Sequence, residues 1–214
     1  TDWWIVGLHM IGRVAAPIFM FFIAEGYHYT RSVKRYALRL LAFAVISHFA
    51  YTFAFGIPFM PFKTSVFNQT SIMWALLWGL IGLHISTRGD LKDWQKVLFI
   101  LFACAVAFCS DWSCIATMAI VYIGAYRGSF RKQMISMMAF VLIYAAVYAI
   151  FIDAVYGGLQ LFAAAAIPLL QRYNGQSGKS AGRWGFYLYY PAHLVLCGIV
   201  RLMLHGNISV MIGG

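Results

Sequence analysis

Long stretches with almost no charged side chains dominate this chain. Eight apolar runs are separated by short polar segments, and they cover Trp4–Ala24, Leu38–Gly56, Ile72–Ile85, Val97–Cys109, Trp112–Tyr126, Met134–Ile152, Leu159–Leu170 and Trp184–Leu204. A helical bilayer crossing needs about 20 apolar residues. Only 10% of the residues are charged, against about 25% in a soluble domain. The chain is therefore expected to lie in a membrane, with no room for a soluble domain.

The runs are apolar on every face, which is typical of helices and not of the alternating strands of an outer-membrane barrel. We therefore predict an all-α fold, a polytopic membrane helical bundle of about eight spans, with residues 1–214 forming a single domain. Four of the runs, 72–85, 97–109, 112–126 and 159–170, are short. These four reach spanning length only with their polar flanks or by tilting within the bundle.

The positive charges alternate along the chain. Of 16 lysine and arginine residues, 13 lie in four alternate connections: Arg31, Lys34, Arg35 and Arg39; Arg88, Lys92 and Lys96; Arg127, Arg131 and Lys132; Arg172, Lys179 and Arg183. The positive-inside rule places these connections in the cytoplasm and both ends of this chain outside. The net charge of +10 is then explained by orientation and contact with lipid headgroups, with no need for nucleic acid. A minority of these residues could bind an anionic cytosolic ligand.

Three ionisable side chains fall inside the apolar runs at similar depth. Arg13 lies nine residues after Trp4, about 13 Å along a helix. Counted from the opposite side of the membrane, His48 lies nine residues after Arg39 and His193 nine residues after Trp184. Ionisable groups in hydrocarbon are costly and are usually paired and functional. We expect a buried polar site near the midplane; the alternative for the histidines is a set of interhelical hydrogen bonds.

Two further acidic residues are candidates for the site. Glu25 and His28 share a face near the end of the first run, and they would form either a helix end at the interface or a polar mouth for a cytosolic substrate. Asp111 occupies a predicted outer turn. It would either cap the following helix or recruit the amine of an external substrate.

The four cysteines, Cys104, Cys109, Cys114 and Cys197, have no metal-ligand spacing, so we expect no metal. Buried cysteines commonly serve as small apolar residues. Cys109 and Cys114 flank an outer turn and would form a disulfide if their geometry allowed it. Cys197, four residues after His193, is the one candidate for a covalent nucleophile.

Several segments resemble the TraX family of membrane proteins. The segments at 11–19 (IGRVAAPIF) and 24–30 (AEGYHYT) are similar to the family's IGRIAFPIF…AEGYxxT block, and 190–194 (YPAHL) is similar to its YPxHL signature. Shorter similarities lie at 45–51 (VISHFAY) and 110–112 (SDW). The resemblance covers essentially the whole chain, and the first and last blocks are the specific ones. Family members normally carry one more helix upstream, with a Met-x-x-Asp-His motif.

The resemblance implies a multi-pass acetyltransferase of the bacterial inner membrane, since the family's namesake acetylates the N-terminus of a conjugative pilin. Acetyl-CoA would be the donor, and an amine or hydroxyl group on a peptide or small molecule would be the acceptor. We assign His193, Arg13, Glu25 and Asp111 to catalysis, with His193 as general base and Arg13 stabilising the oxyanion. Donor binding is assigned to six residues: His28, Arg31, Arg35, Arg39, His48 and Tyr190.

Two other interpretations remain open at this point. A transporter or channel would use the midplane arginine and histidines as a proton or anion path, although the absence of an internal repeat counts against it. The second of these interpretations is a noncatalytic membrane assembly subunit. The sequence identifies neither the acceptor nor the oligomeric state.

Overall fold

The computed structural model describes residues 3–60, 62–63, 68–175 and 180–206. Within these ranges every regular element is a helix, as predicted, and the one β-bridge joins Thr70 and Ser110. The helices are α1 Trp3–Tyr29, α2 Val33–Phe55, α3 Ile72–Ser86, α4 Asp93–Ala107, α5 Ser113–Ala125, α6 Phe130–Phe151, α7 Ala154–Gln160, η1 Leu161–Ala165, α8 Ala166–Gln171 and α9 Ser180–His205.

Because α7, η1 and α8 follow one another without a break, the described chain forms eight helical segments. Four of them are long and apolar enough to cross a membrane: 33–55, 130–151, 154–171 and 187–204. The expectation of a helical membrane protein is therefore supported, while the count of eight spans stays a prediction. Helices α3 and α5 are shorter apolar helices.

Several helices begin before the apolar runs that predict them. Helix α2 begins at Val33 instead of Leu38, and α6 begins at Phe130 instead of Met134. The seventh run was expected from Leu159, but its helix begins at Ala154, where the Asp153 side chain accepts hydrogen bonds from the Val155 and Tyr156 backbone. Hydropathy marks the part of a helix that faces hydrocarbon, whereas capping residues set where the helix starts.

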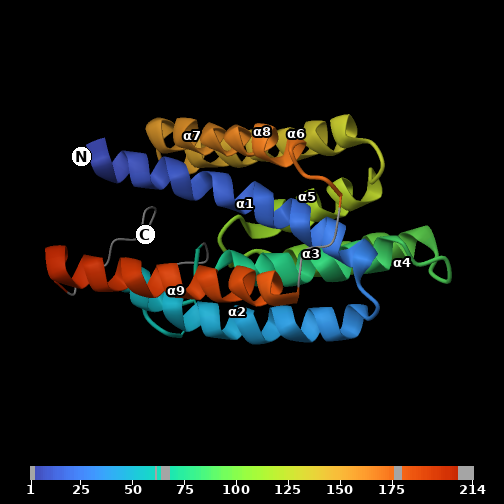
Figure 1. Ribbon diagram of the computed structural model, residues 1–214, viewed down its shortest axis with the longest axis horizontal. Helices are drawn as coiled ribbons and strands as arrows, with labels where there is room; N and C mark the ends of the chain where they lie inside the picture. The colour runs from blue at the N-terminus through green and yellow to red at the C-terminus, as the bar shows by residue number, and fades with distance from the viewer. Residues whose placement is uncertain (1–2, 61, 64–67, 176–179, 207–214) are drawn as a thin grey trace.

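The helices run alternately in opposite directions, and α3 and α5 pack together in the middle of the bundle (Figure 1). On one side α3 contacts α2, which also contacts α9; on the other side α5 contacts α6, which pairs with α7. Helix α1 crosses the centre and contacts α3, α5 and η1. A polar side chain on α1 can therefore contact side chains from several other helices.

Glycines allow α3 and α5 to pack closely. A Cβ atom at Gly79 would lie 2.4 Å from Ile120, and one at Gly124 would lie 2.5 Å from Leu83. Small residues at such contacts are typical of helix pairs in membranes, because they let the backbones approach and increase van der Waals contact. The α3–α5 pair is thus a tightly packed centre against which the other helices are placed.

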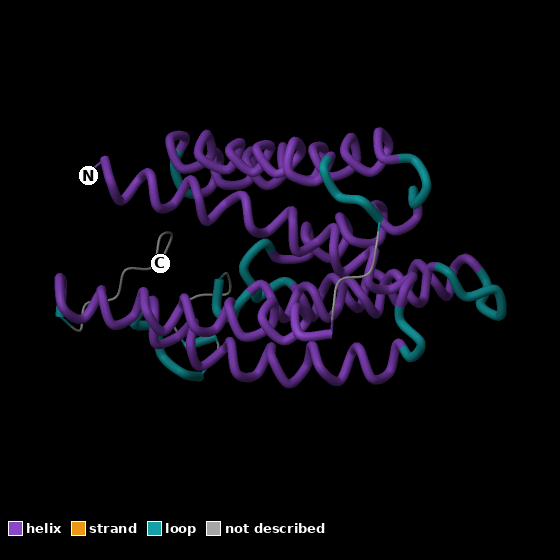
Figure 2. Tube along the Cα trace, viewed as in Figure 1, coloured by secondary structure: helices purple, strands orange, loops and turns teal. Residues whose placement is uncertain are grey.

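One end of the bundle carries the short connections 30–32, 87–92, 126–129 and 172–175, and we call it the basic end (Figure 2). At the other end, α1, α2 and α9 extend beyond α3 and α5 (Figure 1). At 1.5 Å per residue the 15 residues of α3 span about 22 Å and the 23 residues of α2 about 35 Å. The segment before α3 and the α4–α5 turn are therefore surrounded by longer helices.

Candidate active site

The α4–α5 turn places Asp111 inside the bundle. Its backbone N–H donates to the Thr70 carbonyl (2.9 Å), and the Gln69 N–H donates to the Cys109 carbonyl (2.8 Å), so the turn is attached to the segment before α3. Trp112 and Ser113 both have positive φ, 63° and 50°. This backbone conformation is unfavourable for residues other than glycine, and it is commonly found at functional sites.

The Asp111 side chain does not cap α5, so that alternative is wrong. Trp112 is the N-cap residue, and Asp111 instead accepts at Oδ1 from the Trp112 N–H (3.0 Å) and the Tyr144 hydroxyl (3.1 Å). The Tyr144 ring stacks on the buried Trp112 ring at 4.1 Å between centroids. Because Trp112 takes the left-handed conformation, the carboxylate turns toward α6 and away from the first turn of α5.

A chain of polar groups continues from Asp111 along α6. The Tyr144 and Tyr148 hydroxyl groups lie 3.1 Å apart, and the Asn68 amide donates to the Tyr148 hydroxyl at 3.1 Å. The guanidinium carbon of Arg13 lies 5.9 Å from the centre of the Tyr148 ring. Arg13 also interacts electrostatically with Asp111. The charge of Arg13 is thus placed among an aromatic face and a carboxylate, the groups that best compensate a buried cation.

Six residues from five segments form this site, which we call the Arg13 cluster: Arg13, Tyr51, Asp111, Tyr144, Tyr148 and Tyr190. Arg13, Asp111 and Tyr190 were predicted from the sequence as site residues, whereas the other three tyrosines were not. Tyr144 and Tyr148 could have been identified from their spacing, because they lie four residues apart and so share one face of a mostly apolar helix. Tyr51 gave no comparable signal.

Helix α9 brings Tyr190 into the cluster and His193 beside it. Tyr190 is buried, and its ring meets Phe19 of α1 edge-on at 6.0 Å. The His193 ring lies 5.1 Å from the Tyr190 ring and stacks on Tyr189. Within the part of the chain that the structure describes, the buried Nδ1 atom of His193 makes no hydrogen bond of normal geometry.

His48 links α2 to the segments that precede α3. Its Nδ1 atom lies 3.1 Å from the Thr70 hydroxyl and its Nε2 atom 3.0 Å from the Phe59 carbonyl. Both ring nitrogens are therefore engaged by protein groups. These bonds join His48 to the α2–α3 connection and not to another helix, so they are not the interhelical hydrogen bonds considered as the alternative to a site role.

A second polar group surrounds the end of α1 at the basic end. Glu25 is buried and forms an ion pair with Arg127 (3.5 Å), while Arg127 lies over the Tyr29 ring at 5.1 Å. The Tyr27 hydroxyl contacts Thr87 (2.6 Å) and His84 (3.2 Å) at the end of α3. His28 is exposed beside Glu25 and Arg127. Glu25 is therefore separated from the Arg13 cluster by 12 residues of α1.

The first connection of the basic end carries the predicted phosphate ligands. Arg31 and Arg35 are exposed, and Arg39 lies half-buried over the Tyr36 ring at 5.7 Å. The Ser32 side chain caps α2 by accepting from the Arg35 N–H at 3.3 Å. Residues 30–39 contain four basic residues and no acidic residue, so their charge is not neutralised within the connection.

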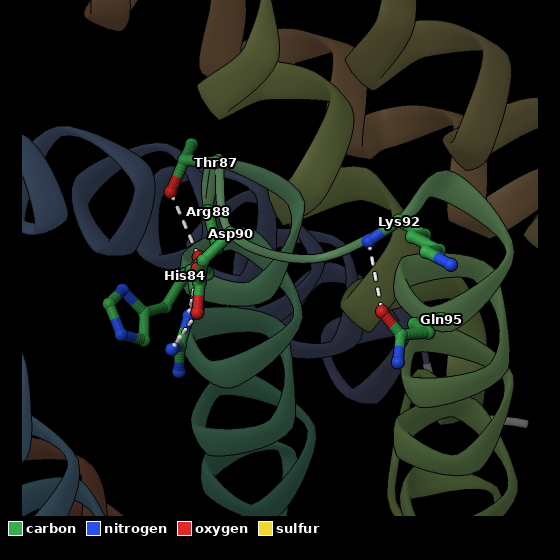
Figure 3. A network of polar contacts seen from close by, with 6 residues as sticks. All are labelled: His84, Thr87, Arg88, Asp90, Lys92 and Gln95. Atoms are coloured by element: carbon green, nitrogen blue, oxygen red, sulfur yellow. Dashed lines mark hydrogen bonds and ion pairs between the residues drawn. The ribbon is translucent and has the colours of Figure 1, made fainter.

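The α3–α4 connection differs, because its charges are paired locally (Figure 3). Arg88 forms a two-pronged ion pair with Asp90, which lowers the pKa of the Asp90 carboxyl through hydrogen bonding. Lys96 pairs with Asp93 at 3.5 Å, and the Gln95 side chain accepts from the Lys92 N–H at 2.9 Å (Figure 3). This connection therefore offers less free positive charge than residues 30–39.

The cysteines do not form the disulfide considered above. Cys109 and Cys114 are free thiols, and the Cys109 thiol faces the Val106 carbonyl at 3.7 Å. Cys197 is exposed on α9. Among the described residues, no three His, Cys, Asp or Glu side chains are grouped in a way that could hold a metal ion.

The fold and the site define a helical membrane protein with a charged, tyrosine-rich cluster enclosed by its helices. The family model described as "TraX protein" matches residues 2–201, and the chain belongs to the TraX family. It is also similar to the probable fimbrial assembly protein FimC, serogroup H1, of Dichelobacter nodosus. The two are 28% identical over 209 residues, which cover 92% of this chain and 84% of that protein. No solved structure matches the chain.

Proposed function

We propose that this protein is an integral-membrane acetyltransferase, which moves an acetyl group from cytosolic acetyl-CoA to an amine or hydroxyl acceptor. The observation that carries the proposal is that α1 joins two polar groups at different depths. Glu25 lies at the basic end and Arg13 lies in the buried cluster, 12 residues away. This separation is about 18 Å along the helix. A long, thin donor with a charged head and a reactive tip would suit such an arrangement.

The donor's phosphates would bind at residues 30–39. Arg31, Arg35 and Arg39 carry guanidinium groups whose paired N–H donors match phosphate oxygens. The absence of acidic residues within 30–39 favours this connection over the α3–α4 connection, where Arg88 and Lys96 are already paired. His28 would add a donor at the mouth. The pantetheine arm would then extend along α1, and the thioester would reach the Arg13 cluster near Tyr190.

The acceptor would be held by Asp111 and the surrounding tyrosines. Oδ1 of Asp111 is fixed by Tyr144 and by the Trp112 backbone, so the carboxylate is oriented before a substrate arrives. An ammonium group would be attracted by this carboxylate and by the faces of aromatic rings. The relative from Dichelobacter nodosus is named as a fimbrial assembly protein. This supports the N-terminus of a fimbrial or pilin-like subunit as the acceptor.

Acetyl transfer needs one base and one group that stabilises negative charge. The bound ammonium first releases one proton to water; the acceptor nitrogen, as the free amine, then attacks the thioester carbonyl carbon and forms the new C–N bond, and the carbonyl oxygen becomes negative. Arg13 stabilises that oxygen, since its charge cannot be lost by deprotonation. His193 takes the acceptor's proton at an imidazole nitrogen. The C–S bond then breaks, and the proton is passed to the departing CoA thiolate.

The test is an assay of the purified protein in detergent with acetyl-CoA labelled in the acetyl group and a synthetic peptide with a free N-terminus. We expect labelled peptide and an equal amount of free CoA thiol. His193→Ala should abolish most of the transfer, while Arg131→Gln, a change at an exposed residue of α6, should not. Complete absence of labelled peptide or of any other labelled acceptor would favour the transporter or assembly interpretations.

A further inference from the structure

Arg201 is a second arginine enclosed by helices, and the sequence arguments did not select it. Its side chain lies on α9 with only 6% of the residue exposed, and its Nη2 atom donates to the Phe53 carbonyl of α2 at 3.1 Å. Since α2 ends at Phe55, Phe53 carries one of the last carbonyls of that helix, where the helix dipole is negative. One turn before Arg201, Gly198 lies against Phe53 and brings the two helices together.

Arg201 is one of the residues that line an open pocket between the end of α2 and α9. The pocket has a volume of about 470 Å³, and its lining residues are Thr52, Phe53, Gly56, Ile57, Pro58, Phe59 and Arg201. Arg201 is the charged residue of this set, and most of the others are apolar. Phe53 and Phe59 are 39% and 54% exposed, so two aromatic side chains extend the pocket wall toward the outside of the bundle.

From its position along α9 we expect Arg201 to lie near the border between hydrocarbon and headgroups. The apolar part of α9 covers Tyr187–Leu204, and Arg201 lies three residues before its end, about 4.5 Å along the helix. Arginine near the end of a spanning helix normally reaches toward the interface. The Arg201 guanidinium instead donates to the Phe53 carbonyl, between α2 and α9, beside the pocket that the residue lines.

We propose that this pocket binds an anionic phospholipid, with the phosphate at Arg201 and an acyl chain along Phe53 and Phe59. Guanidinium groups form paired, charge-assisted hydrogen bonds with phosphate oxygens. The combination of one buried cation with apolar walls at headgroup depth matches a molecule that is anionic at one end and apolar at the other. Arg201 lies 11 residues from Tyr190, about 16 Å along α9, so the lipid site is separate from the Arg13 cluster and independent of the proposed acetyl transfer.

The proposal is tested by purifying the protein in detergent with equal amounts of phosphatidylglycerol and phosphatidylethanolamine and counting retained lipids by native mass spectrometry. We expect the wild type to retain phosphatidylglycerol preferentially. Arg201→Gln should reduce the ratio of the two retained lipids by about tenfold, the loss expected when a hydrogen-bonded ion pair is removed. Arg201→Lys should give an intermediate ratio, and Arg131→Gln, a charge removed at the basic end, should leave it unchanged.

Two further measurements test lipid binding independently of the Arg201→Gln variant. Thr52→Leu, which fills the pocket and leaves Arg201 in place, should lower phosphatidylglycerol retention even if Arg201→Gln fails to fold. In a second arm, thermal unfolding is followed with added phosphatidylglycerol or with inorganic phosphate. Stabilisation by the lipid alone supports the proposal. Equal stabilisation by inorganic phosphate, or retention that Thr52→Leu and Arg201→Gln leave at the wild-type ratio, would overturn it.

Discussion

The guanidinium of Arg13 lies over the ring of Tyr148, a residue 135 positions later in the chain, at 5.9 Å from the ring centre. This contact joins α1 to α6 across the centre of the bundle. Asp111 contributes the opposite charge through electrostatic interaction with Arg13. Tyr148 and Asp111 therefore contribute to compensating the charge of this half-buried arginine.

We predict that Arg13 and His193 act as one unit in acetyl transfer. His193→Ala should lower turnover by about 10²- to 10⁴-fold, as expected for loss of a general base. Arg13→Ala should lower it little further in the His193→Ala background, because parts of one catalytic unit are not additive. Steady-state kinetics of the two single variants and the double variant measure this. Fully multiplicative effects would show that the two residues serve separate roles.

We predict that Tyr144→Phe destabilises the protein more than Tyr148→Phe. The Tyr144 hydroxyl donates to the Asp111 carboxylate, and a hydrogen bond to a charged group contributes about 1.5–3 kcal/mol. Phenylalanine keeps the stacking on Trp112, so the change isolates the hydroxyl. Thermal unfolding in detergent compares the two variants, with Tyr122→Phe, at an exposed tyrosine, as control. Equal melting temperatures for both variants would contradict the role given to Asp111.

We predict that the donor binds at residues 30–39. Replacing Arg31, Arg35 and Arg39 together by Gln should raise the KM for acetyl-CoA with little change in kcat, and rising salt should weaken donor binding in the wild type. Arg88→Gln is the matched control, because Arg88 is paired with Asp90. If the triple variant keeps the wild-type KM, the donor phosphates bind elsewhere.

The positive-inside rule predicts that the basic end is cytoplasmic. Lys63 is described and exposed, whereas Ser177 lies outside the described residues. A cysteine introduced at Lys63 should react with an impermeant thiol reagent added to intact cells, and one introduced at Ser177 should react only after the cells are opened. Both are compared in a background without the native cysteines. The reverse pattern would invert the orientation and move donor binding to the outside.

We predict that Gly124→Ala destabilises the α3–α5 pair. The added Cβ atom would lie 2.5 Å from two methyl carbons of Leu83, and overpacking of this kind costs about 1–3 kcal/mol. Gly89→Ala is the control, since nothing lies within 4 Å of the Cβ position at Gly89. Thermal unfolding of both variants decides the matter. A Gly124→Ala protein as stable as the control would show that α3 and α5 are packed loosely.

The sequence predicted the helices, their approximate positions and the alternation of basic connections, because each depends on local composition. It also identified Arg13, since a charge in an apolar run is unusual, and Asp111, as an acidic residue in a predicted turn. It did not predict that the two lie in one cluster, because that depends on how α1, α6 and the α4–α5 turn pack. Tyr144 and Tyr148 were missed because a tyrosine in a spanning helix is ordinarily an apolar residue with one polar atom. Arg201 was missed because its significance comes from a pocket formed with α2.

The shortness of α3 has an electrical consequence. Where the central helices span about 22 Å and the hydrocarbon layer is about 30 Å thick, polar backbone and side chains occupy a level that lipid tails occupy elsewhere. We therefore expect the insulating layer to be thinner at the centre of this protein than in the surrounding bilayer. Any voltage across the membrane would fall over that shorter distance, so the field acting on the charges of Arg13 and Asp111 would be stronger than on charges at the same depth in the bilayer.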